Sequence, residues 1–226
     1  MPDPDPQPPV WVSVLLDWQN IYKCARDAFG LTDEGSIAGT IDPLKLARHL
    51  TSSVSPDGRL QEVRIYRGRP DNVKDSIGYA AWRSQTAAWK STMGESLIER
   101  YRDLKYRGDE VMEKGIDVWL AIDLVKLAMD KEVDRAIVVS SDTDLLPAIE
   151  LADEISGGPF VEVAGWVGDH PSAAILSVDG VPRRQLGRTL YERFRDETDY
   201  NLSLRVRKKS GWDAQIQAEG RVRRQS

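Results

Sequence analysis

Aspartates are the residues of this chain best placed to do chemistry, because four of them stand where a predicted strand or loop gives way to a helix. Carboxylate oxygens are the ligands that hard cations such as Mg²⁺ and Mn²⁺ prefer. A cation held among them can activate water and stabilise the negative charge that develops on a reacting phosphate. The four candidate metal ligands are Asp17, Asp117, Asp142 and Asp144.

Two of these positions directly follow compact apolar runs. Asp17 comes after residues 10–16, and Asp142 comes shortly after residues 135–140. Such runs, rich in β-branched residues, are typical of strands that are buried on both faces of a parallel sheet. Because the carboxyl ends of parallel strands meet at one edge, we expect these carboxylates to share a pocket. Without a cation between them, they would repel one another strongly.

Each aspartate also has a simpler interpretation. Asp17, Asp117 and Asp144 each precede or begin a predicted helix, where an aspartate commonly caps the helix by accepting backbone hydrogen bonds. Three acidic positions at one sheet edge favour a shared metal site over three separate caps. Two polar residues near these aspartates each have two interpretations. Asn20 either orients water or phosphate or is an ordinary first-turn residue, and Lys114 either holds the scissile phosphate or forms a salt bridge in a loop.

The elements that must position these side chains alternate between strands and helices. Besides the two runs above, strands are expected over residues 60–67, 97–106, 160–166 and 176–182. Helices are expected over residues 18–29, 43–50, 72–93, 118–130, 144–155 and 186–195. This alternation predicts a three-layer, Rossmann-like α/β fold with a mainly parallel sheet flanked by helices. The 118–130 helix is apolar nearly all round, so we expect it to be buried.

Length and composition suit one domain with short tails. The chain has 226 residues, of which 41% are hydrophobic and 30% charged, as in ordinary globular proteins. We expect a disordered leader over residues 1–9, the domain over residues 10–200, and a flexible basic tail over residues 201–226. No apolar run approaches the ~18–20 residues that cross a membrane, so a cytoplasmic location is expected.

Cysteine and histidine are too scarce for a zinc site. The single Cys24 excludes an intrachain disulfide and a thiolate cluster, and we interpret it as a buried, inert thiol. Neither of the two histidines stands at a strand end beside the aspartates. The acidic positions therefore point to Mg²⁺ or Mn²⁺ rather than Zn²⁺.

The charge of the chain is unevenly distributed. The net charge is −5, but residues 201–226 hold seven basic and two acidic residues, or +5, which leaves −10 on the first 200. Within those 200, residues 64–107 hold ten basic and five acidic residues, again +5. An acidic body with a basic middle and tail fits a metal site beside a phosphate-binding surface, although charges scattered over solvated faces would give the same sums.

Three runs of sequence together resemble the NYN domain family, a group of PIN-like proteins of the bacterial LabA type. They are Leu-Asp-Trp-Gln-Asn at 16–20, Lys-Gly-Ile-Asp-Val-Trp-Leu-Ala-Ile-Asp at 114–123, and Val-Val-Ser-Ser-Asp-Thr-Asp-Leu-Leu-Pro at 138–147. Their order, spacing and strand contexts match the family over about residues 10–195. The resemblance implies a PIN-like fold with a Mg²⁺- or Mn²⁺-dependent ribonuclease site. It implies metal ligation by Asp17, Asp117 and Asp142, with Asp144 as a further acidic member and Asn20 as the polar partner of Asp17.

Two acidic positions of the family pattern are harder to assign. PIN-type sites often take a further acid from the middle of the chain, for which Asp71 and Asp75 are the candidates here. Asp123 matches a frequent family position, but it lies six residues past Asp117, about 240° around the helix. A pair with Lys126 or a backbone contact is the preferred interpretation of Asp123, and its role in the site is left open.

The expected partner is RNA, most simply single-stranded. The longest predicted helix interleaves aromatic and cationic side chains, as surfaces that stack unpaired bases do. Its Trp82 and Trp89 stand seven residues apart and hence on one face, for which core packing is the favoured use. Arg67, Arg69 and Arg83 are the better candidates for phosphate contacts.

Three function classes remain, in order of preference. The first is a metal-dependent endoribonuclease, and the second is a non-catalytic RNA- or protein-binding module with the same fold. The third, a small-molecule phosphohydrolase, requires Asp-x-Asp after the first strand, where this chain has Asp17-Trp-Gln. No membrane partner is expected, and a homo-oligomer is left open.

Overall fold

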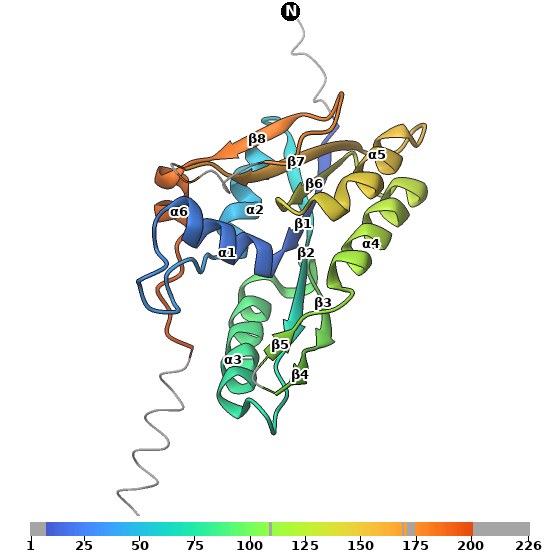
Figure 1. Cartoon of the computed structure of the whole chain (residues 1–226). Helices are drawn as coiled ribbons and strands as arrows, with labels where there is room; N and C mark the ends of the chain where they lie inside the picture. Colours follow the sequence, from blue (N-terminus) through green and yellow to red (C-terminus); the bar gives the residue numbers. More distant parts are fainter. Residues whose placement is uncertain (1–7, 109, 169, 171–174, 201–226) are drawn as a thin grey trace, which may run out of the picture.

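Residues 8–108, 110–168, 170 and 175–200 are described by the computed structural model of the chain (Figure 1). The predicted tail lies wholly outside these residues and the predicted leader mostly so, and both stay predictions. Within the described part, no helix combines the length and the apolar character needed to span a bilayer.

Six parallel strands form the central sheet, in the order β3-β2-β1-β6-β7-β8 (Figure 1). The first strand lies in the interior of the sheet, with β2 on one side and β6 on the other. The chain thus reverses its direction of winding at β1, and ligands of open parallel sheets bind at such a switch point. The strands are β1 (Val10–Asp17), β2 (Gly58–Arg69), β3 (Leu97–Asp103), β6 (Arg135–Val139), β7 (Phe160–Trp166) and β8 (Arg183–Leu186), and a separate antiparallel hairpin is made of β4 (Lys105–Arg107) and β5 (Glu110–Met112).

Helices cover both faces of the sheet, which gives the three-layer α/β fold that the sequence predicts. Alternate side chains of β1 serve opposite faces: Val14 and Leu16 join one apolar core, and Leu15 joins the other. The first core also contains side chains of α1 (Trp18–Ala28), α2 (Pro43–Ser52), α3 (Ser76–Met93) and α6 (Arg188–Phe194). The second contains side chains of α4 (Ile116–Asp130) and α5 (Leu146–Glu154), with the short 3₁₀ turn η2 (Thr143–Leu145) before α5.

The predicted start of the long helix and one predicted strand are wrong. The long helix begins at Ser76 rather than at residue 72, because Asp75 Oδ1 accepts the Gly78 N–H at 2.8 Å and so caps it there. The strand expected over residues 176–182 is not present in the described residues 175–182, and β8 begins only at Arg183.

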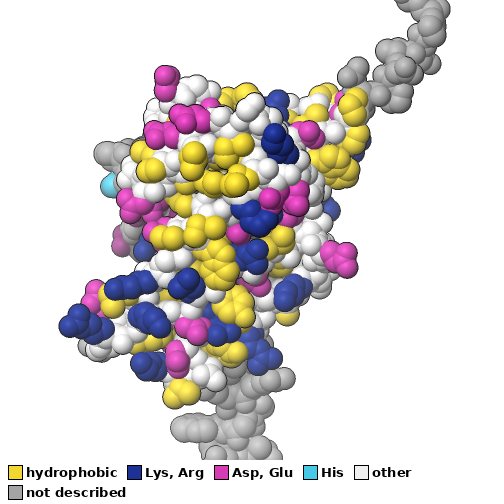
Figure 2. All heavy atoms as spheres, turned by 90° about the vertical axis from the view of Figure 1, so that its right-hand side faces the viewer, with side chains coloured by type: hydrophobic (Ala, Val, Ile, Leu, Met, Phe, Trp, Pro, Cys, Tyr) yellow, Lys and Arg dark blue, Asp and Glu magenta, His cyan; other side chains and the backbone are white. Residues whose placement is uncertain are grey.

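The expectation that the 118–130 helix is buried all round is also wrong. The α4 helix packs against the sheet and α5, and its remaining face is open to solvent (Figure 2). Val118, Ile122 and Met129 are 56%, 59% and 66% exposed. Apolar composition alone therefore overstated the burial of this helix.

Asp123 has neither of the contacts that the sequence suggested. It is buried on the inward face of α4, where its Oδ2 accepts hydrogen bonds from the Tyr66 hydroxyl at 2.9 Å and from Arg100 Nε at 3.0 Å. Arg64 Nη1 lies 3.6 Å from the same oxygen, and Lys126 pairs with Asp130 instead. Asp123 thus belongs to a buried ionic cluster that joins α4 to β2 and β3.

Candidate functional site

One pocket at the carboxyl edge of the sheet gathers polar side chains from distant parts of the chain. It has a volume of about 500 Å³. The β1 and β6 strands pair in register up to Leu16 and Val139, so the residues that follow them lie next to each other. The side chains predicted for the site that line this acidic pocket are Asp17, Asn20, Lys114, Asp117 and Asp142.

Asp17 sits at the end of β1, where two hydrogen bonds fix its carboxylate. Its Oδ2 accepts from the Ser140 hydroxyl at 2.8 Å, and its Oδ1 accepts from the Asn20 N–H at 3.3 Å. Burial raises the pKa of Asp17 to about 6, the two hydrogen bonds oppose this rise, and the carboxylates of Asp142 and Asp117 add to it. Asp17 therefore both caps α1 and faces other acids, so its two predicted roles coexist.

The side chains of Asp142 and Asp144 line different pockets, although the two residues are only two positions apart. Asp142 lines the acidic pocket, and its Oδ1 accepts the Asp144 N–H at 3.0 Å, which caps the turn η2. Asp144 is exposed and lines a separate hollow between α4 and α5, together with Asp117 and Pro147. The structure thus brings Asp142, but not Asp144, into one pocket with Asp17.

Asp117 enters the pocket from the first turn of α4. The cap position is Gly115, whose φ of 74° lies in the left-handed region that glycine adopts without strain, and no side chain caps this helix. The helix-cap interpretation of Asp117 is therefore wrong. The preceding Lys114 is exposed and lines the same pocket.

Asn20 connects two elements of the site. Its Oδ1 accepts the Ser141 N–H at 2.8 Å, which ties α1 to the loop that carries Asp142. The same oxygen accepts from the Cys24 thiol at 3.5 Å. This thiol is half-buried, and its burial raises its pKa, which favours the unreactive protonated form.

The sequence analysis missed a further acid from the middle of the chain, Glu113. It directly follows β5 and lines the acidic pocket. Its Oε1 is buried and has no hydrogen-bond partner among the described residues. Burial, together with the nearby charge of Asp17, raises the pKa of Glu113 to about 7. The only signal in the sequence was its position directly before Lys114.

The two acids proposed for this role are engaged elsewhere. Asp71 Oδ1 accepts the N–H groups of Val73 and Lys74, both at 2.8 Å, and Asp75 caps α3. Neither residue lines the acidic pocket. Both carboxylates stabilise the turn before α3 rather than the site.

Comparison with known proteins gives the chain a family. The sequence model of the NYN domain matches residues 11–178, which is more than half of the chain. This chain belongs to the NYN domain family. The family is PIN-like, its members are usually nucleases, and such nucleases generally use divalent metal ions. A search of curated proteins gives no significant match.

A solved structure agrees with the fold of this NYN domain. It is the crystal structure of a protein of unknown function, VPA0982, from Vibrio parahaemolyticus RIMD 2210633. The two chains have 18% sequence identity and a TM-score of 0.50, over 76% of this chain and 99% of that chain. At this level of identity the likeness supports the fold alone.

The three arginines predicted to contact phosphate lie outside the acidic pocket of the NYN domain. Arg67 is only 4% exposed, and its guanidinium pairs with Glu99 at 2.6 Å, so it serves the protein interior. Arg69 pairs with Asp103 at 2.6 Å, whereas Arg83 is exposed on α3. The prediction for Arg67 is therefore wrong, because β2 is covered on both of its faces.

The donors of the acidic pocket fit a hard divalent cation. No three His, Cys, Asp or Glu side chains within the described residues are already grouped as metal ligands. The lining nevertheless has four carboxylates, from Asp17, Glu113, Asp117 and Asp142, and neither a thiolate nor an imidazole. Mg²⁺ binds through a few carboxylates and retains several waters, so it does not need a closed protein cage. A cation would also compensate the buried, unpartnered Oε1 of Glu113.

Proposed function

We propose that this NYN domain is a metal-dependent ribonuclease that hydrolyses RNA phosphodiester bonds at the acidic pocket. Asp17, Glu113, Asp117 and Asp142 would hold Mg²⁺ or Mn²⁺. The observation that carries the proposal is that carboxylates from separate parts of the chain face one pocket, where burial and the neighbouring carboxylates raise the pKa of Asp17 and Glu113. Perturbed carboxylates in a cleft favour a functional site over a structural one.

A bound divalent ion supplies a concentrated positive charge that lowers the pKa of water and neutralises charge on a phosphate. The protein's own part is to hold the carboxylates in place. The Ser140 hydroxyl fixes Asp17, and Asn20 fixes the loop that carries Asp142. The exposed ammonium of Lys114 at the pocket provides a point charge for a phosphate oxygen.

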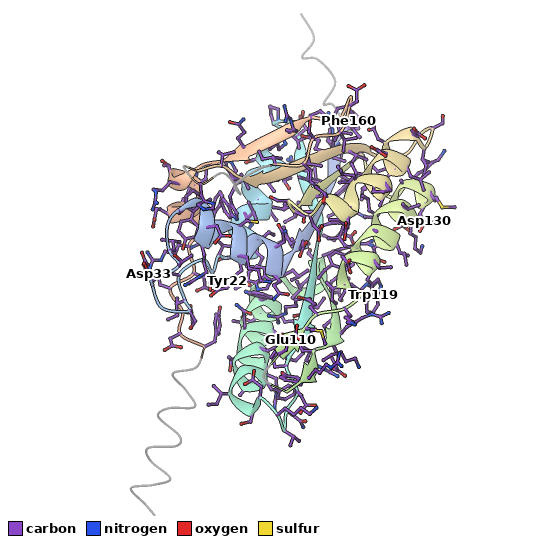
Figure 3. All side chains as sticks on the ribbon, viewed as in Figure 1. Tyr22, Asp33, Glu110, Trp119, Asp130 and Phe160 are labelled. Carbon is purple, nitrogen blue, oxygen red and sulfur yellow. The ribbon has the colours of Figure 1, made fainter. Side chains whose placement is uncertain are left out.

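A cationic edge beside the pocket offers a path for the RNA backbone. Arg100 and Arg102 belong to β3, and both guanidinium groups are 5.6 Å from the ring centroid of Trp119. Trp119 lies at the beginning of α4 (Figure 3). Arg102 is exposed, and its guanidinium lies next to Gly115 of the acidic pocket. Lysine and arginine side chains gather on this part of the surface (Figure 2). Such an edge favours a polyanionic substrate over a small phosphate ester.

Cleavage of RNA by the purified full chain tests the proposal. Unstructured and hairpin RNAs would be incubated with Mg²⁺, with Mn²⁺ and with chelator, using wild type and Asp142→Asn. We expect internal cuts that need a divalent ion and disappear in the variant. Cleavage that persists in chelator, or an Asp142→Asn protein as active as wild type, would contradict the proposal.

A non-catalytic RNA-binding module is the second candidate, favoured by the absence of a ready metal-ligand group among the described residues. It predicts that wild type binds the same RNAs with no cleavage in any metal. Binding alone, with intact RNA after long incubation, would therefore select this candidate.

A further inference from the structure

A second pocket adjoins the acidic pocket and shares Gln19 and Glu113 with it. Its volume is about 330 Å³, which is within the range of small-ligand sites. It lies between α1 and α3, on the face of the sheet opposite α4. We call it the aromatic pocket and define it by Trp18, Tyr22, Ala81, Trp82, Gln85 and Glu113.

The aromatic walls of this pocket come from two helices and are packed against other aromatic side chains. Trp18 of α1 meets Trp89 edge to face, with ring centroids 4.6 Å apart. Trp82 of α3 stacks on Tyr79 at 5.9 Å and meets Tyr101 edge to face at 5.2 Å. Rings packed in this way lose little conformational freedom when a ligand binds.

Arg67 organises the base of the pocket, although it is not free to bind phosphate. Its guanidinium lies 5.2 Å from the Trp82 ring and 4.5 Å from the Trp89 ring. Its Nη1 donates to Gln85 Oε1 at 2.5 Å. This bond fixes the orientation of the Gln85 amide and leaves its nitrogen as a donor at the pocket wall.

These features together suit a nucleobase. A base is flat and stacks on aromatic faces, and its edge takes hydrogen bonds from amides such as those of Gln19 and Gln85. An aliphatic side chain of a peptide would use neither the flat walls nor the amides. Because the two pockets share a border, the phosphate attached to a nucleoside in the aromatic pocket would lie at the acidic pocket. A cation held by the carboxylates there would bind this phosphate.

We propose that the aromatic pocket binds the base of an unpaired nucleotide whose phosphate lies at the acidic pocket. The proposal takes its ligand class from the proposed function. In this proposal, the protein recognises single-stranded RNA mainly by stacking one base in the aromatic pocket, next to the bond that is cut. The outer face of α3 contributes less to recognition.

Binding of mononucleotides to the full chain tests this directly, because they contain no phosphodiester bond for a ribonuclease to cleave. Adenosine 5′-monophosphate, uridine 5′-monophosphate and ribose 5-phosphate would be titrated by calorimetry in Mg²⁺. Stacking of one base predicts that the better nucleotide binds about tenfold or more tightly than ribose 5-phosphate. Ala81→Phe fills the pocket and should remove this preference, whereas Ala87→Phe, at an exposed position of the same helix, should retain it.

Tyr22→Leu provides the same test without adding bulk, since it removes one aromatic wall, and it should weaken the preference at least severalfold. Equal binding of nucleotides and ribose 5-phosphate by wild type would overturn the proposal, as would an unchanged preference in both Ala81→Phe and Tyr22→Leu. A wild-type protein that prefers nucleotides yet cuts no RNA would support the pocket and refute the nuclease. A protein that cuts RNA but binds nucleotides no better than ribose 5-phosphate would support the nuclease and refute base binding in the aromatic pocket.

Discussion

Two regions of this protein contain buried carboxylates, and they differ in what surrounds the negative charge. In the buried ionic cluster beneath α4, Asp123 lies between Arg64 and Arg100 and accepts a hydrogen bond from Tyr66. In the acidic pocket, the neighbours that raise the pKa of Asp17 are other carboxylates. The first region is neutralised by its own arginines, whereas the acidic pocket is lined by four carboxylates and two lysines, Lys23 and Lys114.

The difference distinguishes an acid with a structural role from the acids that we propose to bind a metal ion. An acid whose charge is balanced by arginines stabilises the packing of α4 on the sheet, because breaking such a pair leaves a buried charge uncompensated. Acids that face one another without a cation destabilise the fold, and such an arrangement is accounted for when a ligand supplies the positive charge.

The largest expected effect is on cleavage. Asp142→Asn keeps the size of the side chain but removes its charge from the pocket, and we expect a loss of RNA cleavage of at least about a hundredfold. Asp130→Asn is the control, since Asp130 is exposed at the far end of α4, away from the acidic pocket (Figure 3). Initial rates in Mg²⁺ measure both, and similar losses in the two variants would refute the special role of the pocket.

The next effect is on stability. Asp123→Ala removes the shared partner of Arg64 and Arg100, and we expect the free energy of unfolding to fall by about 3–5 kcal/mol. Urea denaturation measures this change. A fall below about 1 kcal/mol would mean that the cluster acts like a surface salt bridge and that the comparison is wrong.

A third prediction concerns pH in the absence of metal. The folded state raises the pKa of Asp17 from 3.8 to about 6, so folding is favoured when this carboxyl is protonated and loses that advantage as pH rises through this window. Asp17→Asn should therefore become more stable relative to wild type as pH rises from about 4 to 7, by a few degrees in unfolding temperature. Thermal melts in chelator check this. A gap that stays constant with pH would show that Asp17 does not carry the unfavourable charge.

The smallest effect is expected at Asp144. Because its side chain is exposed and lies outside the acidic pocket, Asp144→Asn should change the cleavage rate by less than about fivefold. The same rate assay as for Asp142→Asn provides the measurement. A loss of cleavage as large as that of Asp142→Asn would indicate that Asp144 is a metal ligand after all.

The alternation of strands and helices could be predicted because it depends on local patterns. The runs that became β1, β6 and β7 are mainly apolar, as strands covered on both faces are. Since such strands end at one edge, the shared pocket of Asp17, Asp117 and Asp142 followed from chain order. Helix boundaries that are set by capping hydrogen bonds, such as the start of α3 after Asp75, were harder to predict from the sequence.

The roles that depend on distant partners could not be predicted. Asp123 is held by Tyr66 and Arg100, which are 57 and 23 residues away in sequence. Arg67 appeared free because its partner Glu99 is 32 residues away on β3. Glu113 follows a three-residue strand whose pattern is too short to reveal which way the chain turns. The first two cases need the three-dimensional pairing of β2 with β3 and α4, which no local pattern contains.

Direct binding of Mn²⁺ gives the most immediate test that the acidic pocket holds a divalent cation. Electron paramagnetic resonance would follow free Mn²⁺ in titrations of wild type, Asp117→Asn and Asp130→Asn, two variants with the same charge change on the same helix. We expect wild type and Asp130→Asn to bind alike, and Asp117→Asn to bind at least about tenfold more weakly. Wild type that binds no Mn²⁺, or Asp117→Asn that binds as wild type does, would contradict the account.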